Sequence, residues 1–135
     1  MPAEIQTFLP LIVFAWTVIT FALGHFIGHR AAVKRDKRKE FNSLAAPIRA
    51  ELLKQIETIK SGDYEEAKIS RDSIFLLSDL SSNPSKITDA YKQFKFANSW
   101  DGLEVKVNEY GDRQEMNTSK ALIAAEDLLK LIPLR

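Results

Sequence analysis

The hydrophobic pattern divides the chain into one long apolar segment and a remainder with helical periodicity. The apolar segment, residues 5–27, is 23 residues long and contains no Asp, Glu, Lys or Arg. At ~1.5 Å per residue a helix of this length reaches about 35 Å, which is enough to cross a hydrocarbon core of ~30 Å with some tilt. The pattern therefore predicts a transmembrane helix over residues 5–28, preceded by a short outer tail, residues 1–4.

A cleavable signal peptide and a buried core helix are the two alternative interpretations of this segment. A signal peptide has basic residues before its apolar run and small residues at its cleavage site. Here Glu4 is the charged residue before the run, and His25, Phe26 and Ile27 stand where cleavage would occur. An uncharged core helix of this length is unusual in a chain of 135 residues. Both comparisons favour a membrane anchor.

A basic segment follows the apolar one directly. Residues 28–40 hold six basic and two acidic residues, whereas the net charge of the whole chain is +1. Basic residues next to a span mark its cytoplasmic end, so we expect the N-terminus outside and the rest of the chain in the cytoplasm. The segment is rich in helix formers and predicts a juxtamembrane helix over residues 29–43. We expect its basic side chains to attract anionic lipid headgroups at ~1 kcal/mol each: Arg30, Lys34, Arg35, Lys37, Arg38 and Lys39.

Three residues of the apolar segment are candidates for helix packing inside the membrane. Gly24 and Gly28 form a GxxxG pattern, which Ala32 extends by one further step of four. Small residues four apart let two helix backbones approach closely, so this face fits a homodimer or a groove for another membrane protein. Trp16 lies in the middle of the segment, whereas tryptophan prefers the membrane interface. A central tryptophan therefore either packs against another helix or faces lipid.

Apolar residues then recur at spacings of three and four, which predicts an amphipathic helix: Phe41, Leu44, Ile48, Leu52, Ile56 and Ile59. Pro47 interrupts this stripe and disfavours a helical conformation for Ala46. We therefore expect a break near residues 44–46 and a helix over residues 47–60, with Pro47 in its first turn. The Ser61-Gly62 pair then ends the helix.

Three more helices are predicted after it. They begin after Ser70 or Asp72, at Pro84, and after Asn117 or Thr118, and Pro133 ends the last one. Residues 101–111 fit either a continuation of the middle helix or a short strand, because Leu103, Val105 and Val107 alternate with polar residues. The predicted fold class is mainly α: one N-terminal transmembrane helix extended by the basic segment, then a small cytoplasmic domain of three to four short helices over residues 47–132.

The sequence offers no constellation that specifies a reaction or a ligand. It contains no cysteine, which excludes disulfides and thiolate sites. His25 and His29 are four residues apart but lack the internal Glu of a zinc-binding H-E-x-x-H pattern, and no glycine-rich phosphate loop is present. The basic residues lie against the membrane and the remainder is slightly acidic, which disfavours nucleic-acid binding. We therefore expect a protein that is not an enzyme, with no catalytic or metal-binding residue and no cofactor.

The run GHRAAVKRDKRKEFNSLAAPIR resembles a segment that recurs in small, uncharacterised bacterial single-pass membrane proteins. The later ISRDSI and DAYKQFKFA stretches are also similar, so the resemblance covers about half of the chain. Those proteins have an N-terminal span and a Gly-His/Asn-Arg junction. The resemblance implies a location in the bacterial inner membrane, and it implies neither an activity nor functional residues.

These patterns favour a single-pass inner-membrane protein with a non-catalytic cytoplasmic domain that docks or scaffolds a protein partner, whose identity the sequence does not specify. The first alternative is an accessory subunit of a larger membrane complex that packs through Gly24, Gly28 and Trp16. The second is a phage-encoded lysis or exclusion protein. A scaffold keeps its partner when an unrelated apolar helix replaces the span, whereas an accessory subunit loses it.

Neutralising five basic residues together is predicted to disturb the orientation of the span more than the folding of the domain. The five changes are Lys34, Arg35, Lys37, Arg38 and Lys39 to Gln, which leave Arg30 as the single basic residue of the segment. The charge difference that orients the span then shrinks, and inverted molecules should appear. Tags at both ends, read by protease protection in spheroplasts, measure the orientation. If every variant molecule keeps its C-terminal end inside, as we expect for the unchanged chain, the basic segment is not the orienting element.

Overall fold

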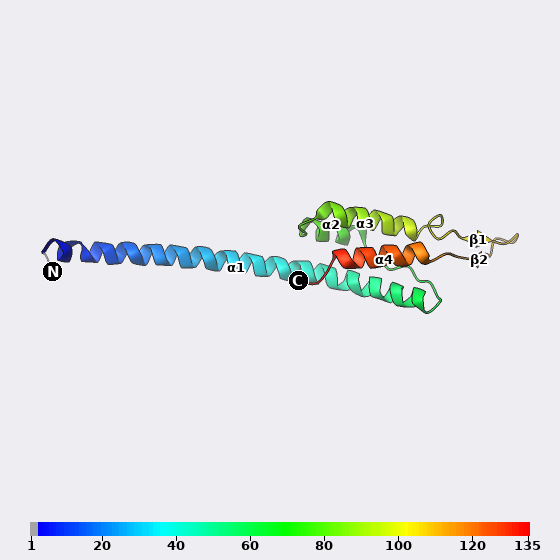
Figure 1. Ribbon diagram of the computed structural model, residues 1–135, viewed down its shortest axis with the longest axis horizontal. Helices are drawn as coiled ribbons and strands as arrows, with labels where there is room; N and C mark the ends of the chain where they lie inside the picture. Colours follow the sequence, from blue (N-terminus) through cyan, green and yellow to red (C-terminus); the bar gives the residue numbers. More distant parts are fainter. Residues whose placement is uncertain (1–2) are drawn as a thin grey trace. The chain divides into compact units, whose positions relative to one another are not determined.

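The computed structural model describes residues 3–135, with side chains described from Gln6 onward. About 70% of the chain is helical, in four helices, so the mainly α class is confirmed. The elements follow the order shown in Figure 1: α1 (Ala3–Lys60), α2 (Arg71–Asp79), α3 (Pro84–Ala97), β1 (Lys106–Val107), β2 (Arg113–Glu115) and α4 (Ser119–Leu131). The chain forms two compact units, Met1–Arg38 and Lys39–Arg135, and each is described by itself.

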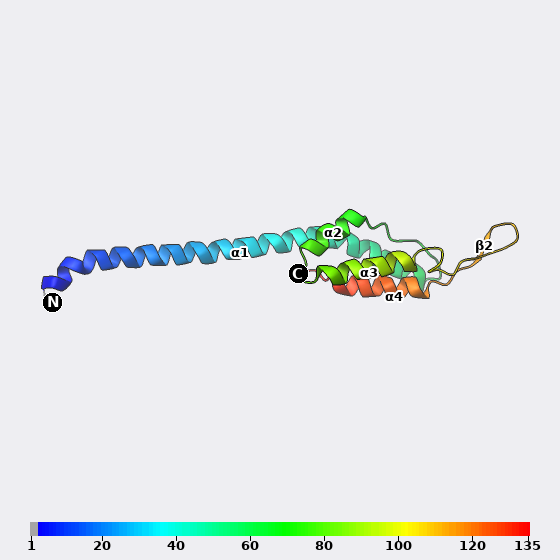
Figure 2. The same cartoon turned by 90° about the horizontal axis from the view of Figure 1, so that it is seen from above.

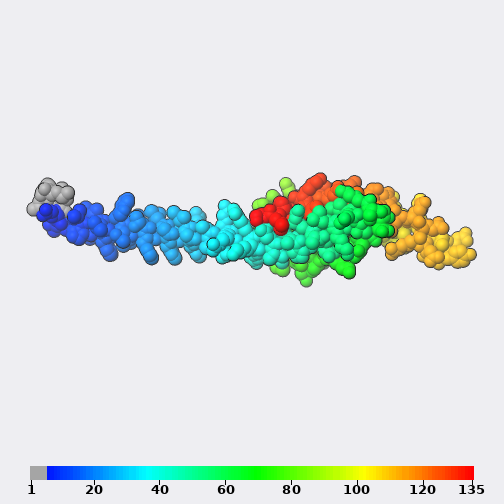
Figure 3. All heavy atoms as spheres, turned by 90° about the horizontal axis from the view of Figure 1, so that it is seen from below, coloured from blue at the N-terminus to red at the C-terminus, as the bar shows by residue number. Residues whose placement is uncertain are grey.

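In its described residues the first unit consists of a single helix, the N-terminal part of α1. Its apolar side chains are exposed, and Figure 3 draws this part of the helix in blue to cyan. This helix is long and apolar enough to cross a membrane. Half of the predicted outer tail, residues 1–2, lies outside the described residues, while Ala3 and Glu4 already belong to α1.

The predicted break near residues 44–46 is wrong, because α1 continues through Pro47 to Lys60. A proline inside a helix costs about 3 kcal/mol. Here Pro47 lies on the exposed side of the helix, while Phe41, Ala45 and Ile48 are buried on both sides of it along the chain. Burial of a large apolar side chain stabilises by about 1.5–3 kcal/mol. The apolar contacts before and after the proline together outweigh its cost, so the helix stays unbroken.

The core of the second unit lies between the C-terminal part of α1 and the three short helices. The predicted stripe of α1 faces this core, where it meets the apolar faces of α2, α3 and α4. The largest fully buried side chains are Phe41, Leu52, Ile74, Leu77, Ile87, Phe94, Leu128 and Ile132. Figures 1 and 2 both show α3 and α4 side by side and antiparallel, with the β1–β2 hairpin beyond the end that joins them.

The predicted ends of the short helices are confirmed. Ser70 occupies the position before α2, Pro84 is the first residue of α3, and Thr118 precedes α4. The α1 helix ends at Lys60, and Gly62 then adopts a φ of 96°, which favours a residue without a Cβ. Pro84 suits the first turn because it lacks an N–H that this turn leaves without a partner, whereas neither Ser70 nor Thr118 makes a side-chain capping hydrogen bond.

Residues 101–111 were predicted to be either a continuation of the helix before them or a short strand. The structure has a strand there, β1, which covers Lys106–Val107. The strands β1 and β2 pair antiparallel, with Lys106 opposite Glu115 and Val107 opposite Arg113. The side-chain oxygen of Asn108 accepts the backbone N–H groups of Tyr110 and Asp112 at 3.0 and 2.8 Å and so shapes the turn. The hairpin is exposed on both faces.

Side chains of α1 hold the C-terminal end of α4 in place. The Arg49 guanidinium donates from Nη1 to the carbonyl oxygens of Leu129 and Ile132, both at 3.1 Å. These carbonyls lie at the C-terminal end of the helix, where the regular backbone pattern runs out; the Leu129 carbonyl also accepts the backbone N–H of Ile132 at 3.4 Å. Asn42 exchanges two hydrogen bonds with the backbone of Arg135, at 2.7 and 2.9 Å. The two contacts fix α4 and the residues after it against α1.

Gly102 is predicted to be intolerant of a side chain. A Cβ at this position would overlap the carbonyl oxygen of Phe96 and lie 2.7 Å from the Cα of Ala97, and both are backbone atoms that cannot move away cheaply. We expect Gly102→Ala to lower the free energy of unfolding by about 1–3 kcal/mol, the usual range for overpacking. Thermal denaturation of the full chain in detergent measures this.

Gly111→Asn is the matched control for this prediction. Gly111 has a φ of 83° but nothing within 4 Å of an added Cβ, and Asn tolerates this conformation better than most residues. Its melting temperature should fall less than that of Gly102→Ala, because the substitution strains the backbone at φ 83° but meets no neighbouring atom. Equal melting temperatures for the two variants would contradict the close approach at Gly102.

Candidate functional site

The three residues predicted for helix packing lie on α1 with open space around them. An added Cβ at Gly24 or Gly28 would meet nothing within 4 Å, and the Trp16 side chain is 69% exposed. At 3.6 residues per turn the two glycines are about 40° apart around the helix, whereas Trp16 lies about 80° from Gly24. A helix docked on the glycines would therefore meet Trp16 only at the edge of the contact.

Two threonines extend the glycine face toward the N-terminus. Thr17 and Thr20 lie within about 40° of Gly24 around the helix. The Thr17 hydroxyl donates to the carbonyl of Val13 at 2.8 Å, and the Thr20 hydroxyl donates to Trp16 at 2.9 Å. The helix itself satisfies both hydroxyls, so this face of small residues costs little to place in an apolar environment.

The six basic residues predicted to face lipid headgroups are all exposed on α1. Among the described residues no ion pair joins any of them to a carboxylate. Arg30, Lys34 and Lys37 share one side of the helix because their spacings are four and three residues. The Arg30 guanidinium also lies 4.9 Å from the centre of the Phe26 ring. These charges are therefore available to an anionic partner.

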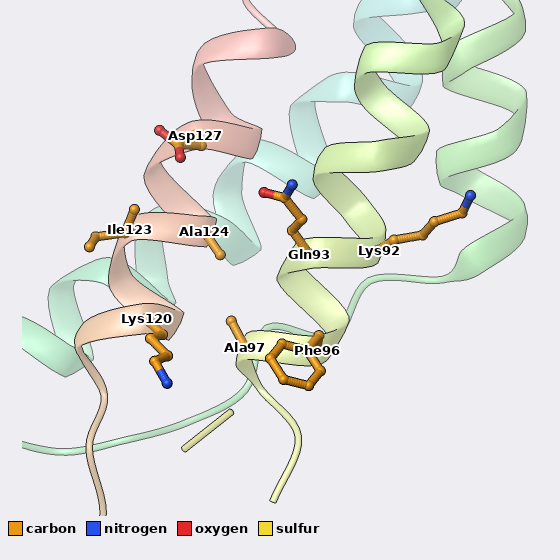
Figure 4. Close-up of a pocket in the computed structure, with 8 residues that line it drawn as sticks. All are labelled: Lys92, Gln93, Phe96, Ala97, Lys120, Ile123, Ala124 and Asp127. Carbon is orange, nitrogen blue, oxygen red and sulfur yellow. The ribbon is translucent and has the colours of Figure 1, made fainter. Parts of the chain in front are cut away.

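A groove with a mostly apolar lining lies between α3 and α4 in the second unit. Its volume is about 490 Å³. Figure 4 shows Ala97 and Ala124 facing the gap between the two helices, with Gln93 pointing into it. Both alanines are small, so they leave this gap open where a larger side chain would project into it.

Large apolar side chains border this groove and are left uncovered. Phe96 of α3 is 62% exposed and Ile123 of α4 is 58% exposed. In Figure 4 the Phe96 ring lies at the end of the groove near Lys120, and Ile123 points away from α3. Neighbouring exposed apolar side chains of this kind mark interaction surfaces in soluble domains.

The charged residues of the groove are paired within the chain. Lys120 contacts Glu104 with 2.6 Å between Nζ and Oε1, and Lys130 lies 3.8 Å from Asp127. All four side chains are about half exposed or more, so both pairs are screened by water and salt and add little to stability. Such pairs can exchange partners at little cost when another charged group approaches.

The pattern of apolar residues along the chain does not predict this groove. A signal was present, because Phe96 and Ile123 are large apolar residues that fall outside the buried stripes of their helices. An apolar residue at a position where helical periodicity expects a polar one is a usable indication of a contact surface. The position of the groove was not readable, because it depends on which faces of α3 and α4 meet.

A buried polar cluster joins α1, the segment after it and the end of α3. The side-chain oxygen of Asn98 accepts hydrogen bonds from Gln55 Nε2 at 2.5 Å and from the Tyr64 hydroxyl at 2.7 Å. Gln55 is 1% exposed, and its Oε1 atom has no hydrogen-bond partner. Burial raises the pKa of Tyr64 to about 12. The phenol therefore stays neutral and donates its proton to Asn98 throughout the physiological range.

One aromatic side chain is exposed in the turn of the hairpin and another beside its base. Tyr110 in its turn is 89% exposed. At its base the Arg113 guanidinium lies 5.5 Å from the centre of the Trp100 ring, a cation–π contact that holds the half-exposed tryptophan in place.

The two histidines of α1 stack on each other. The rings of His25 and His29 are stacked with 6.4 Å between their centres. Within the part of the chain that the structure describes, no three His, Cys, Asp or Glu residues are arranged to hold a metal ion.

Comparison with known proteins gives no relative: no family model matches the chain, and neither the curated proteins nor the solved structures yield a match.

Substitutions at Ile123 and Leu128 should have opposite consequences although both residues lie on α4. Leu128 is fully buried, so Leu128→Ala should lower the free energy of unfolding by about 2–5 kcal/mol. Ile123 faces solvent, and Ile123→Ala should change it by no more than about 0.5 kcal/mol. Chemical denaturation of the full chain in detergent, at a concentration at which it is monomeric, compares them, and a large loss for Ile123→Ala would mean that this side chain belongs to the core of its own chain.

Proposed function

We propose that this protein is a single-pass membrane protein of the bacterial inner membrane that displays a non-catalytic docking domain in the cytoplasm. The observation that carries the proposal is the contrast between the two units of the chain. The first exposes an uncharged apolar helix, and the second buries its apolar stripes in a core of its own. A helix that leaves its apolar side chains uncovered needs an apolar surrounding, which a bilayer supplies.

The proposed orientation of the span in the membrane follows from the basic segment. The six basic residues without a carboxylate partner come directly after the apolar helix. In the cytoplasmic orientation they lie beside anionic headgroups, whose attraction adds to the bias that sets topology. The lipid bilayer and its anionic headgroups are thus the first partners of the proposed function.

Docking is the role that the surface of the second unit supports. Phe96 and Ile123 leave apolar surface exposed around the α3–α4 groove, and Trp100 and Tyr110 do so near the hairpin. Aromatic side chains are enriched in protein interfaces because they bury a large area at a low cost in conformational entropy. A partner that is a protein fits these features.

The alternative function is that of an accessory subunit which packs through its span. The small face formed by Thr17, Thr20, Gly24 and Gly28 favours this candidate, because such a face permits close contact with another transmembrane helix. The two functions differ in which unit holds the binding energy.

An exchange of the span separates the two candidates. A photo-reactive residue is placed at Phe96 in the native chain and in a variant whose residues 5–27 are replaced by an unrelated apolar helix. If the second unit docks the partner, the same cross-linked species should form in intact membranes with both chains. Loss of the species in the span variant would refute docking through the second unit and favour the accessory subunit.

The matched control for this exchange places the photo-reactive residue at Glu57, which is exposed on α1 outside the groove. It should give little or none of the species that forms at Phe96. An equal yield at both positions would show that cross-linking reports proximity in the membrane and not a docking surface, which would also contradict the proposal.

A further inference from the structure

The exposed face of α4 has a charge pattern that complements itself. Lys120 and Asp127 are seven residues apart, so they lie about 10.5 Å apart along the helix and within about 20° around it. Ile123 and Ala124 lie between them, at the midpoint. When two such helices meet antiparallel about this midpoint, each Lys120 comes level with the Asp127 of the other helix. Both pairs then form at once, as a two-fold interface requires.

The apolar residues at the midpoint suit the same arrangement. Ile123 projects from α4 away from α3, while Ala124 lies on the groove side (Figure 4). A two-fold axis through the midpoint keeps like residues on like sides. It therefore sets the two isoleucines against each other and the two alanines against each other. The methyl side chain of Ala124 allows the helices to come close, at the short end of the usual 8–10 Å between helix axes.

We propose that the α4 face beside the α3–α4 groove is the contact surface for a second copy of this chain, with the two α4 helices antiparallel about Ile123 and Ala124. Phe96 stands at the Lys120 end of the groove, which places its ring level with the C-terminal half of the partner helix. The contact covers the two large apolar side chains, Phe96 and Ile123, that the second unit leaves exposed beside the groove.

A parallel pairing does not fit the same residues. It would set Lys120 against Lys120 and Asp127 against Asp127, and like charges opposite each other disfavour an interface. The existing contacts of Lys120 and Asp127 do not prevent the antiparallel pairing. The Lys120 ammonium has three donors and the Asp127 carboxylate has several acceptor sites. Each can therefore keep its exposed partner, Glu104 or Lys130, while it meets the second copy.

This inference deepens the docking role proposed above and rests on it, because it names a second copy of this chain as the protein that covers Phe96 and Ile123. If the species cross-linked at Phe96 in membranes is not a dimer of this chain, the second copy is wrong while the docking role stands. The α4 contact also differs from a homodimer through Gly24 and Gly28. That dimer would depend on the span, whereas the α4 contact should survive its replacement.

Single cysteines test the pairing and its direction. The chain has no cysteine, so each introduced thiol has only its own counterpart to react with. In the antiparallel pairing Ala124→Cys brings two thiols together and should form a disulfide-linked dimer on mild oxidation of the full chain in detergent. Lys120→Cys alone should not, because its two copies are about 10.5 Å apart along the helix. A mixture of Lys120→Cys and Asp127→Cys chains should cross-link.

Three results would overturn the inference. The first is a failure of Ala124→Cys to cross-link in protein whose helical spectrum and melting temperature match those of the unchanged chain. The second is cross-linking of Lys120→Cys with itself as strongly as in the mixture, which indicates parallel pairing. The third is an equal yield from Glu57→Cys, an exposed position on α1, which indicates random collision.

A charge exchange supplies an independent readout. Lys120→Glu places two carboxylates together at each end of the contact and should lower the dimer yield of Ala124→Cys severalfold. Adding Asp127→Lys restores opposite charges and should restore the yield. If the double exchange stays as low as the single one, the pairing of residues 120 and 127 is wrong.

Discussion

The apolar stripe that α1 contributes to the second unit is the constraint on which the rest of this fold depends. The α2 and α4 helices have nine and 13 residues, and isolated helices of that length are marginal in water. Their stability comes from burying one face, and the stripe from Phe41 to Ile59 provides the surface against which they are buried. The same dependence keeps α1 helical through Pro47, because the residues on both sides of the proline belong to a single core.

Polar contacts then decide how the helices are held relative to each other. Apolar packing tolerates small shifts, whereas hydrogen bonds require defined distances and angles. Arg49 holds the last turn of α4, and Asn98 accepts from both Gln55 and Tyr64. These contacts join segments that are 34 to 83 residues apart in sequence. A buried cluster of this kind is costly when it is incomplete, so it favours one arrangement over its neighbours.

The apolar surface of α3 and α4 is partly buried in the core and partly exposed to solvent. In α3 and α4 the apolar residues fall into two sets, one on the core stripe and one outside it. Phe96 and Ile123 belong to the second set, and more than half of each side chain stays exposed. The α3–α4 groove lies beside them. Exposed apolar side chains next to a groove are a surface that contact with another molecule can cover.

The sequence by itself determined the features that depend on neighbours along the chain. The uncharged run and the basic residues after it define a helix suited to a membrane, and Pro84 and Pro133 mark helix ends through the restricted backbone of proline. Helical spacing also identified the stripe of α1 that is buried in the second unit, because a face is set by residues three and four apart. Only the tertiary structure decided whether Pro47 breaks α1, which faces of α3 and α4 meet, and that Gln55 finds Asn98. These outcomes depend on contacts between distant segments, and their energies exceed the local preferences from which periodicity is read.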